Sequence, residues 1–247
     1  MQPVRVTFLG TGDAFSAGGN QQAGYLVQSA AASVLLDCGA GTLMSMKRLG
    51  IDPLALDVIA LSHLHGDHFA GLPFLFLAYK YETPRERPLR IAGPPGTGER
   101  VWALFRAAYQ GLAADPLPFV VEFTEMTPGT PVDFGTFMLT PFRVPHQQDE
   151  VSLGLRVAVD GRTIVYSGDT GWTDDLVTAS EGADLFICEC CYFETRLPMH
   201  LDYPRLAENR HRFDAKRIVL THLGREVLAR RGELDMELAR DGLVVEV

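Results

Sequence analysis

The feature that most constrains this chain is the segment 63–68, which reads HLHGDH and contains four side chains that can bind a metal ion. It directly follows residues 57–62, an apolar run of the length of a strand. A buried strand that ends in a tight loop, with a glycine to let the backbone turn, gathers these four side chains in one small volume. Imidazole and carboxylate together suit zinc, iron or manganese better than calcium or magnesium. Because three of the seven histidines of the chain fall within these six residues, a metal site is predicted rather than a solvated loop.

Three later segments repeat this arrangement, in that one ligand-type side chain follows an apolar strand. His146 comes just after the strand predicted at 137–144, Asp169 follows an apolar run and a glycine turn, and His222 follows residues 218–221. One such residue alone is more typical of an ordinary loop. Three of them, after the first motif, favour a single site built from several strand ends.

The H-x-H-x-D-H motif after a buried strand resembles the metal motif of the metallo-β-lactamase superfamily. The resemblance spans about residues 4–247. It implies an α/β (α+β) fold, a four-layer αββα sandwich in a single hydrolase domain over residues 1–247. It also implies two divalent metal ions, with zinc expected first and manganese or iron as alternatives. The implied ligands are His63, His65 and His146 for one ion, Asp67, His68 and His222 for the other, and Asp169 between them, with Asp67 also counted as catalytic.

Within the superfamily, the chain looks most like the branch that holds tRNase Z, the carbon–phosphorus-lyase phosphodiesterase and the class II cyclic-nucleotide phosphodiesterases. The resemblance rests on three features: the opening segment 8–12 (FLGTG), Glu189 at the end of the first strand after Asp169, and His200, which lies 22 residues before His222. It implies that Glu189 and His200 form the second catalytic pair of that branch. A surface histidine near a helix start remains the alternative for His200, whereas an unpaired buried carboxylate at position 189 would be costly.

The predicted function is a two-metal phosphodiesterase for small cyclic or nucleotide-like phosphodiesters, in which His200, oriented by Glu189, assists the leaving group. The alternatives are a hydrolase of another ester (lactone, thioester or sulfate ester), a tRNA 3′-processing endonuclease and, more remotely, a non-hydrolytic or oxidoreductase relative. Bacterial tRNase Z inserts a long arm between the histidine and the bridging aspartate, whereas His146 and Asp169 are only 23 positions apart. The formal charge of −9 provides no basic field, so no stable nucleic-acid binding is expected.

For three other local patterns, a purely structural role is an alternative to a functional one. Asp37 closes the strand at 33–36 and is either a partner of a ligand histidine or a turn-capping residue. Residues 93–98 (GPPGTG) imitate the start of a phosphate-binding loop, but Glu99 and Arg100 occupy the places of its lysine and serine or threonine, so a structural turn is predicted. The adjacent cysteines at 190 and 191 lack a second pair for a structural zinc site.

Composition and length set the remaining bounds. A chain of 247 residues with 47% hydrophobic and 21% charged residues is typical of a globular protein that can bury a substantial core. The start of the chain lacks a charged segment followed by an apolar one, and the most apolar segment, 69–78, is too short to span a bilayer. Since four cysteines in this pattern do not indicate a disulfide framework, a cytoplasmic enzyme without a membrane partner is expected. The apolar segment also makes a homodimer a candidate assembly.

The periodicity of apolar residues predicts alternating strands and helices, with a glycine-rich loop at 13–22 and a hairpin turn at Asp160-Gly161. Strands are expected at 4–9, 25–28, 33–36, 58–61, 89–92, 119–123, 137–144, 152–159, 163–166, 184–188 and 216–221 and within 234–247, and helices at 42–49, 69–81, 99–110, 173–180 and 203–212.

Overall fold

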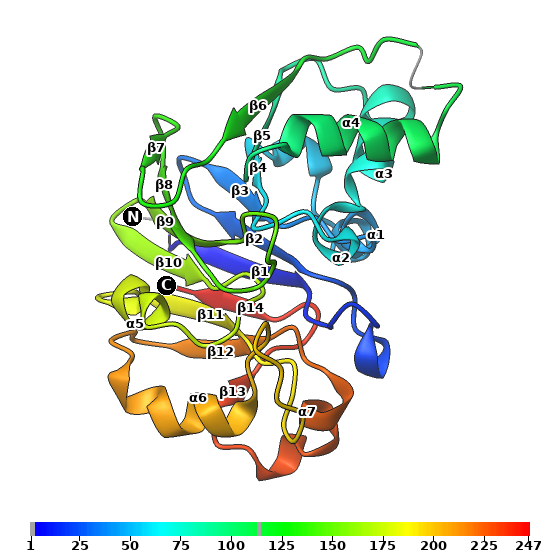
Figure 1. Ribbon diagram of the computed structural model, residues 1–247. Helices are drawn as coiled ribbons and strands as arrows, with labels where there is room; N and C mark the ends of the chain where they lie inside the picture. Colours follow the sequence, from blue (N-terminus) through cyan, green and yellow to red (C-terminus); the bar gives the residue numbers. More distant parts are fainter. Residues whose placement is uncertain (1–2, 113–114) are drawn as a thin grey trace.

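The computed structural model describes residues 3–112 and 115–247. Two seven-stranded sheets pack face to face, and helices cover the outer face of each (Figure 1). An isolated sheet would expose its apolar faces to water. The two sheets therefore bury their inner faces against each other, and the helices cover their outer faces. The expected four-layer αββα sandwich is confirmed.

The first sheet comes mainly from the N-terminal half and has the order β14-β1-β2-β3-β4-β5-β6. In this sheet β2 is antiparallel to both β1 and β3, and β3 to β6 run parallel to one another. The last strand of the chain pairs antiparallel with the first one. The bounds are β1 (Arg5–Gly10), β2 (Gly24–Gln28), β3 (Ser33–Leu36), β4 (Val58–Ala60), β5 (Leu89–Gly93), β6 (Val121–Glu125) and β14 (Val244–Glu246).

The second sheet has the order β13-β12-β11-β10-β9-β8-β7. Strands β7 to β10 form an antiparallel meander, and β10 to β13 are parallel. The predicted hairpin turn is confirmed, because Asp160 (φ 47°) and Gly161 (φ 74°) both adopt the left-handed conformation that a two-residue turn requires. The bounds are β7 (Val132–Asp133), β8 (Met138–Arg143), β9 (Leu153–Val159), β10 (Arg162–Tyr166), β11 (Leu185–Glu189), β12 (Ile218–Thr221) and β13 (Glu237–Leu238).

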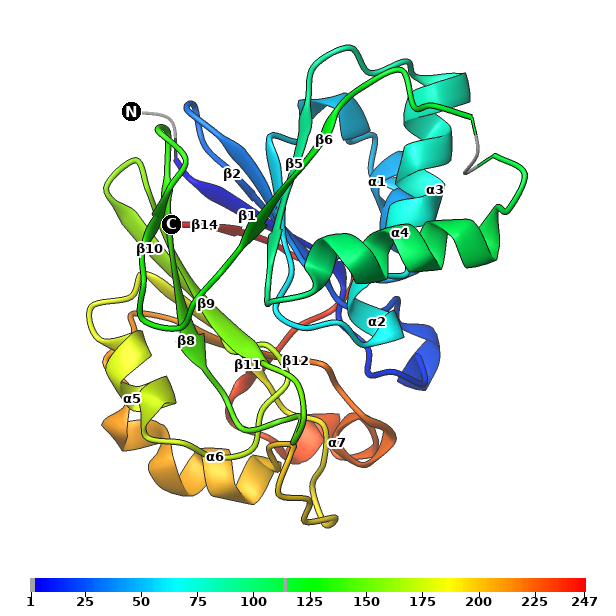
Figure 2. The ribbon, with the colours of Figure 1, turned by 45° about the horizontal axis from the view of Figure 1, so that its top comes forward.

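Seven α-helices of the described residues form the two outer layers, with α1 to α4 on the first sheet and α5 to α7 on the second (Figure 2). Each outer layer has its own apolar cluster, separate from the cluster between the sheets. The bounds are α1 (Thr42–Arg48), α2 (Gly66–Phe69), α3 (Leu72–Leu77), α4 (Thr97–Ala108), α5 (Asp175–Ser180), α6 (Tyr203–Asn209) and α7 (Arg225–Ala229). None of the described helices has the length and apolarity needed to cross a bilayer.

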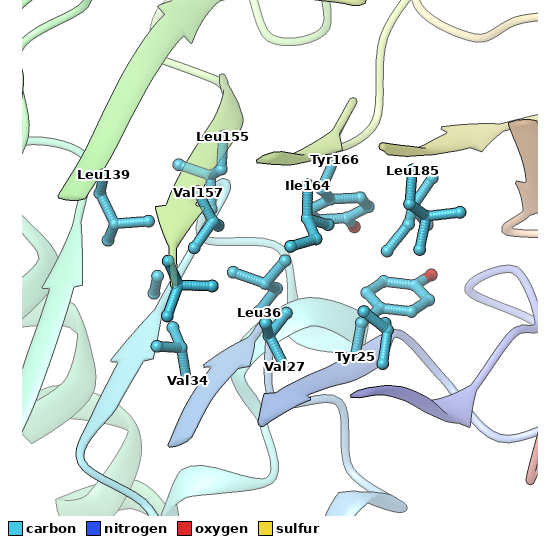
Figure 3. Packing of buried hydrophobic residues seen from close by; sticks show 14 of the residues in the cluster. Tyr25, Val27, Val34, Leu36, Leu139, Leu155, Val157, Ile164, Tyr166 and Leu185 are labelled. Carbon is cyan, nitrogen blue, oxygen red and sulfur yellow. The ribbon is translucent and has the colours of Figure 1, made fainter. Parts of the chain in front are cut away.

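The core between the sheets is apolar, except where it approaches the ends of the strands. Aliphatic side chains of β2 and β3 face those of β8 to β11 (Figure 3). Two buried tyrosines, Tyr25 and Tyr166, pack with ring centroids 4.8 Å apart. Their hydroxyls bond to Thr221 and Asp37, respectively. The core thus ends in a polar layer that supports the residues beyond the strands.

The helix predicted at 69–81 is confirmed in part: α2 ends at Phe69, a new helix begins at Leu72 as α3, and it continues as a π-helical turn at Ala78–Glu82. At Gly71 a Cβ atom would lie 2.3 Å from the carbonyl oxygen of Gly39, so the backbones meet too closely for a larger residue. Most of the segment is buried, while Phe74 remains 44% exposed. Its apolar composition therefore belongs largely to the core, and the homodimer stays a prediction.

Smaller differences concern the ends of elements. The strand predicted at 119–123 lies at 121–125, the helix predicted at 203–212 ends at residue 209, and α7 was not predicted. The turn at 93–98 is structural as predicted, since the Gly96 amide donates to the Glu125 carboxylate and the Thr97 hydroxyl to the Pro94 carbonyl.

Candidate metal centre

The seven predicted ligands come together where strands of both sheets end. The loop after β4 carries His63 and His65, and Asp67 and His68 lie in the first turns of α2. His146 follows β8, Asp169 follows β10 and His222 follows β12. Strands β8, β10 and β12 point the same way in one sheet, so their carboxyl ends share an edge, as in other sites of open α/β sheets.

Asp169 lies between two groups of ligand atoms. Its Oδ2 is 3.9 Å from the Nε2 atoms of both His63 and His146. Its Oδ1 is 3.3 Å from His68 Nε2 and 3.3 Å from His222 Nδ1. One carboxylate oxygen therefore faces each group, which is the arrangement expected of a bridging ligand.

The members of each group approach one another closely. His65 Nδ1 is 3.0 Å from His146 Nε2, and Asp67 Oδ2 is 3.2 Å from His68 Nε2. Ligand atoms within 4.8 Å of each other define one cluster of His63, His65 and His146 and a second of Asp67, His68, Asp169 and His222. These two groups contain the same residues as the predicted sets, and the assignment of the residues to two metal ions stays a prediction.

Hydrogen bonds on the far side of three imidazoles orient them toward the centre. The Nδ1 of His68 lies 2.7 Å from the Asp37 carboxylate, and the Nδ1 of His146 lies 3.0 Å from the Met199 carbonyl. The Ser62 hydroxyl donates to Asp37 and lies 3.0 Å from His63 Nδ1, which therefore donates to it. With a proton assigned to each Nδ1, the Nε2 lone pairs point inward, as metal ligands require.

Several side-chain atoms that point toward the centre of the cluster have no hydrogen-bond partner among the described residues. His63 Nε2, His68 Nε2, Asp169 Oδ1 and His222 Nδ1 are buried and make no hydrogen bond there. Buried polar atoms are rarely left without a partner, because desolvation then goes uncompensated. The donor set of imidazoles and carboxylates and these orphaned atoms together fit two divalent cations.

Burial and the neighbouring charges shift the pKa values of the ligands. Burial lowers the pKa of His146 to about 4 and, together with the nearby His68, lowers the pKa of His63 well below its usual range. For Asp169, burial is outweighed by His222 and His68, so its pKa lies well below the usual value. For His68, the carboxylates of Asp169 and Asp37 outweigh burial and raise the pKa. The lowered pKa values keep His63 and His146 neutral and Asp169 ionised, whereas the raised pKa of His68 favours a proton on that ring.

Asp37 bonds to His68, a predicted ligand, as one of its two sequence interpretations expects. Its buried carboxylate accepts hydrogen bonds from the Ser62 amide and hydroxyl, from His68 and from the Tyr166 hydroxyl. Tyr166 was not singled out from the sequence, because 129 residues separate it from Asp37.

Two residues of this region have a strained backbone. Asp37 (φ 56°) and His222 (φ 53°) adopt the left-handed conformation without being glycines. Such residues cost about 1–3 kcal/mol each and persist where the surroundings hold them in place. In this chain both residues belong to the candidate metal centre or contact it, so the backbone strain coincides with this site.

Glu189 and His200 lie beside the cluster. His200 Nδ1 is 2.9 Å from Glu189 Oε1, while the Thr170 and Leu201 amides donate to the same carboxylate. The Glu189 carboxylate is fully buried, and these hydrogen bonds compensate for the free-energy cost of its desolvation. Burial disfavours charge on His200, but Glu189 outweighs it and raises the pKa to about 9. His200 is thus held, protonated, next to His146, with ring centroids 4.9 Å apart.

One cysteine also lies near the cluster. The thiol of Cys191 shares a group with His200 and His222 in which all ligand atoms lie within 4.8 Å of one another. From the sequence, this cysteine was a candidate only for a separate zinc site, which was dismissed for want of a second pair. Its place directly after Glu189 and Cys190 on the β11 strand end is the signal that could have located it here.

The fold and the cluster define the class of this protein, a hydrolase of the metallo-β-lactamase fold. The chain belongs to the family described as anti-Pycsar protein Apyc1, which matches residues 4–244. A Mycobacterium leprae (strain TN) relative, uncharacterized protein ML1173, is 32% identical over 226 residues, which cover 89% of this chain and 78% of the relative.

Two solved structures show the same fold. The metallo-β-lactamase fold protein YhfI of Bacillus subtilis superposes with a TM-score of 0.77 at 25% identity, over 99% of this chain and 100% of YhfI. The short form of human tRNase Z gives a TM-score of 0.80 at 26% identity, over 98% of each chain. The predicted relationship to the tRNase Z branch of the superfamily is therefore confirmed.

Proposed function

We propose that this protein is a metal-dependent phosphodiesterase that cleaves small cyclic or nucleotide-like phosphodiesters. The observation that carries the proposal is the His200–Glu189 pair beside the seven-residue cluster. Two divalent ions held by the cluster would supply Lewis acidity toward water and the phosphoryl group. Diester cleavage also needs a proton for the departing oxygen, and His200 is placed and charged to give one.

The contacts of His200 determine which of its ring nitrogens can donate a proton to the substrate. Because Glu189 occupies Nδ1 of His200, the other ring nitrogen is available to the substrate. A ring nitrogen of His200 lies within 4.8 Å of ligand atoms of His146 and Asp169, so a diester bound at the cluster is within its reach. A positioned general acid of this kind contributes about 10²–10⁴-fold to the rate.

The test is a substrate screen on metal-loaded protein with cyclic nucleotides, ribose cyclic phosphates and dinucleotides, beside a panel of lactones, thioesters and sulfate esters. The proposal expects turnover of at least one phosphodiester class far above every other ester class. Preference for a lactone or thioester would assign the site to another ester and would refute the phosphodiesterase.

Processing of tRNA is the second candidate, favoured by the likeness to human tRNase Z. The segment between His146 and Asp169 holds a loop and the β9–β10 hairpin, with no long arm. With a net charge of −9, the chain also lacks the positive field that would attract a phosphate backbone. Both observations favour the small diester.

A further inference from the structure

Gly171 offers no side chain to the candidate metal centre, yet it lies where segments that carry the site meet. It comes two residues after Asp169, the central carboxylate. Its amide donates to the carbonyl of Pro145 at 2.7 Å, and Pro145 directly precedes the predicted ligand His146. This backbone hydrogen bond joins the chain after β10 to the chain after β8, close to a predicted ligand on each side.

A second contact of Gly171 involves residues 190–202, the loop that connects β11 to α6 and is called the His200 loop below. A Cβ atom at position 171 would lie 1.8 Å from the carbonyl oxygen of Pro198 in this loop. Since non-bonded atoms do not approach so closely, a larger residue would displace the Pro198 carbonyl. The φ angle of Gly171 is not in the left-handed region, so it is the contact with the His200 loop that requires glycine.

The residues next to Pro198 connect this contact to both parts of the site. The carbonyl of Met199 accepts a hydrogen bond from Nδ1 of His146, 3.0 Å away. The following residue, His200, pairs with Glu189. One short segment therefore orients a predicted metal ligand through its backbone and presents the proposed general acid through its side chain.

Burial does little to hold the tip of the His200 loop in place. Residues 196–198 are exposed, and Met199 and His200 are half-buried. A segment with so little buried surface has a low local stability and depends on a few specific contacts. The contact with Gly171 and the hydrogen bond with His146 are among them.

We propose that Gly171 is a positioning residue that lets the His200 loop dock, and that metal binding at His146 and the placement of His200 are linked through this contact. Binding of an ion to Nε2 of His146 requires the ring orientation that the Met199 carbonyl holds. By reciprocity, an ion bound to that ring stabilises the docked loop. The role of His200 rests on the proposed phosphodiesterase, whereas the linkage between metal binding and the loop does not.

Hydrogen exchange followed by mass spectrometry tests the linkage without any substrate. The amides of His200 and Leu201 donate hydrogen bonds, so their exchange reports on the docked loop. Peptides that cover residues 197–201 should exchange roughly 5- to 150-fold more slowly in zinc-loaded than in chelated wild type, although the segment contains none of the seven predicted ligands. In Gly171→Ala they should exchange rapidly in both states. Exchange that does not respond to zinc in wild type, or that responds equally in Gly171→Ala, would overturn the inference.

Competition with a chromophoric chelator gives a second readout. Gly171→Ala should weaken the binding of one ion by about 10–100-fold, which is the usual effect of losing the partner of a ligand imidazole. Gly232→Ala is the matched control, because a Cβ atom at position 232 meets nothing within 4 Å and the residue lies in the turn Arg231–Glu233. An affinity of Gly171→Ala equal to that of the control would overturn the role of Gly171. If Gly171→Ala does not fold, the comparison of zinc-loaded and chelated wild type still decides on the linkage.

Kinetics of the metal-saturated protein separates this inference from the proposed function. Gly171→Ala should lower kcat for diesters with alkyl leaving groups by about 10²-fold, because a displacement of about 1 Å has that effect. Most activity on p-nitrophenyl esters should remain, since their leaving group needs no proton from His200. Equal losses on both ester types would overturn the role of Gly171 in placing His200. Exchange that responds to zinc as expected, in a wild type that cleaves no diester, would instead refute the proposed phosphodiesterase and leave the linkage in place.

Discussion

His200 Nδ1 lies 2.9 Å from Glu189 Oε1, and the two side chains come from opposite ends of the loop between β11 and α6. Burial raises the pKa of Glu189, against the opposing effect of His200. Two backbone amides also bond to this carboxylate, so its orientation is fixed independently of the histidine. The relationship makes His200 an oriented cation beside the candidate metal centre.

His200→Ala should lower cleavage of diesters with alkyl or ribose leaving groups by about 10²–10⁴-fold and leave most activity on p-nitrophenyl esters. The physical reason is that p-nitrophenolate departs without a proton, whereas an alkoxide does not. Rates on both substrate types, measured with metal content, check this. Equal losses on both types at unchanged metal content would show that His200 positions the substrate.

Glu189→Gln should produce a milder form of the same selectivity. The amide can still accept a hydrogen bond from His200, but it no longer stabilises the imidazolium. We expect kcat for natural-type diesters to fall while KM changes little. A loss confined to KM would contradict the assignment of Glu189 as the residue that orients and charges His200.

Asp169→Ala should remove the carboxylate that faces both groups of ligands. Metal analysis of protein purified without chelator should give about two ions per chain in wild type and at least one fewer in the variant, with nearly all activity lost. Because His211 lies exposed on a turn away from the cluster, His211→Ala is a suitable control. A fully active metal-free wild type would contradict the two-metal site.

Asp37→Asn should weaken metal binding without removing a ligand. The variant keeps the shape of the side chain but loses the charge that orients His68, and such partners are typically worth 10–100-fold in metal affinity. Competition with a chromophoric chelator measures the affinity. Tyr166→Phe, which removes a single hydrogen bond to the same carboxylate, should show a smaller effect. Identical affinities in wild type and Asp37→Asn would assign Asp37 to turn formation instead.

Precursor tRNA should be a poor substrate, because no arm separates His146 from Asp169 and the net charge is −9. Cleavage of a 3′-extended tRNA is compared with cleavage of a small diester at equal enzyme concentration. Comparable rates would make tRNA processing the better assignment.

Glu226 should stabilise the loop at 193–195 in a pH-dependent manner. Hydrogen bonds from the Thr195 hydroxyl and amide lower its pKa from 4.5 to about 2. A carboxylate whose pKa is lowered by folding stabilises the native state above its unfolded pKa, and this effect disappears as the pH falls through the folded pKa. The Tm difference between chelated wild type and Glu226→Gln should therefore be largest above about pH 5 and vanish near pH 2. A constant difference, or an equal one for the exposed Glu208→Gln control, would contradict this role.

The sequence alone was sufficient for the local parts of the site. Residues 63–68 gather four predicted ligands because neighbours in a tight loop cannot lie far apart. The Asp160-Gly161 turn fixes the register of β9 and β10 for the same reason. The strand-end positions of His146, Asp169 and His222 could also be predicted, since parallel strands bring their carboxyl ends to one edge. Zinc as the metal, a cytoplasmic location and the homodimer stay predictions.

Tertiary structure decided what depends on segments far apart in the chain. The Tyr166–Asp37 hydrogen bond spans 129 residues. The close approach of Gly71 to the Gly39 carbonyl also joins distant segments, whereas the break between α2 and α3 is marked locally by Pro73 in the first turn of α3. Propensity and periodicity describe only neighbours within a few positions, whereas the packing of the two sheets determines which distant side chains meet.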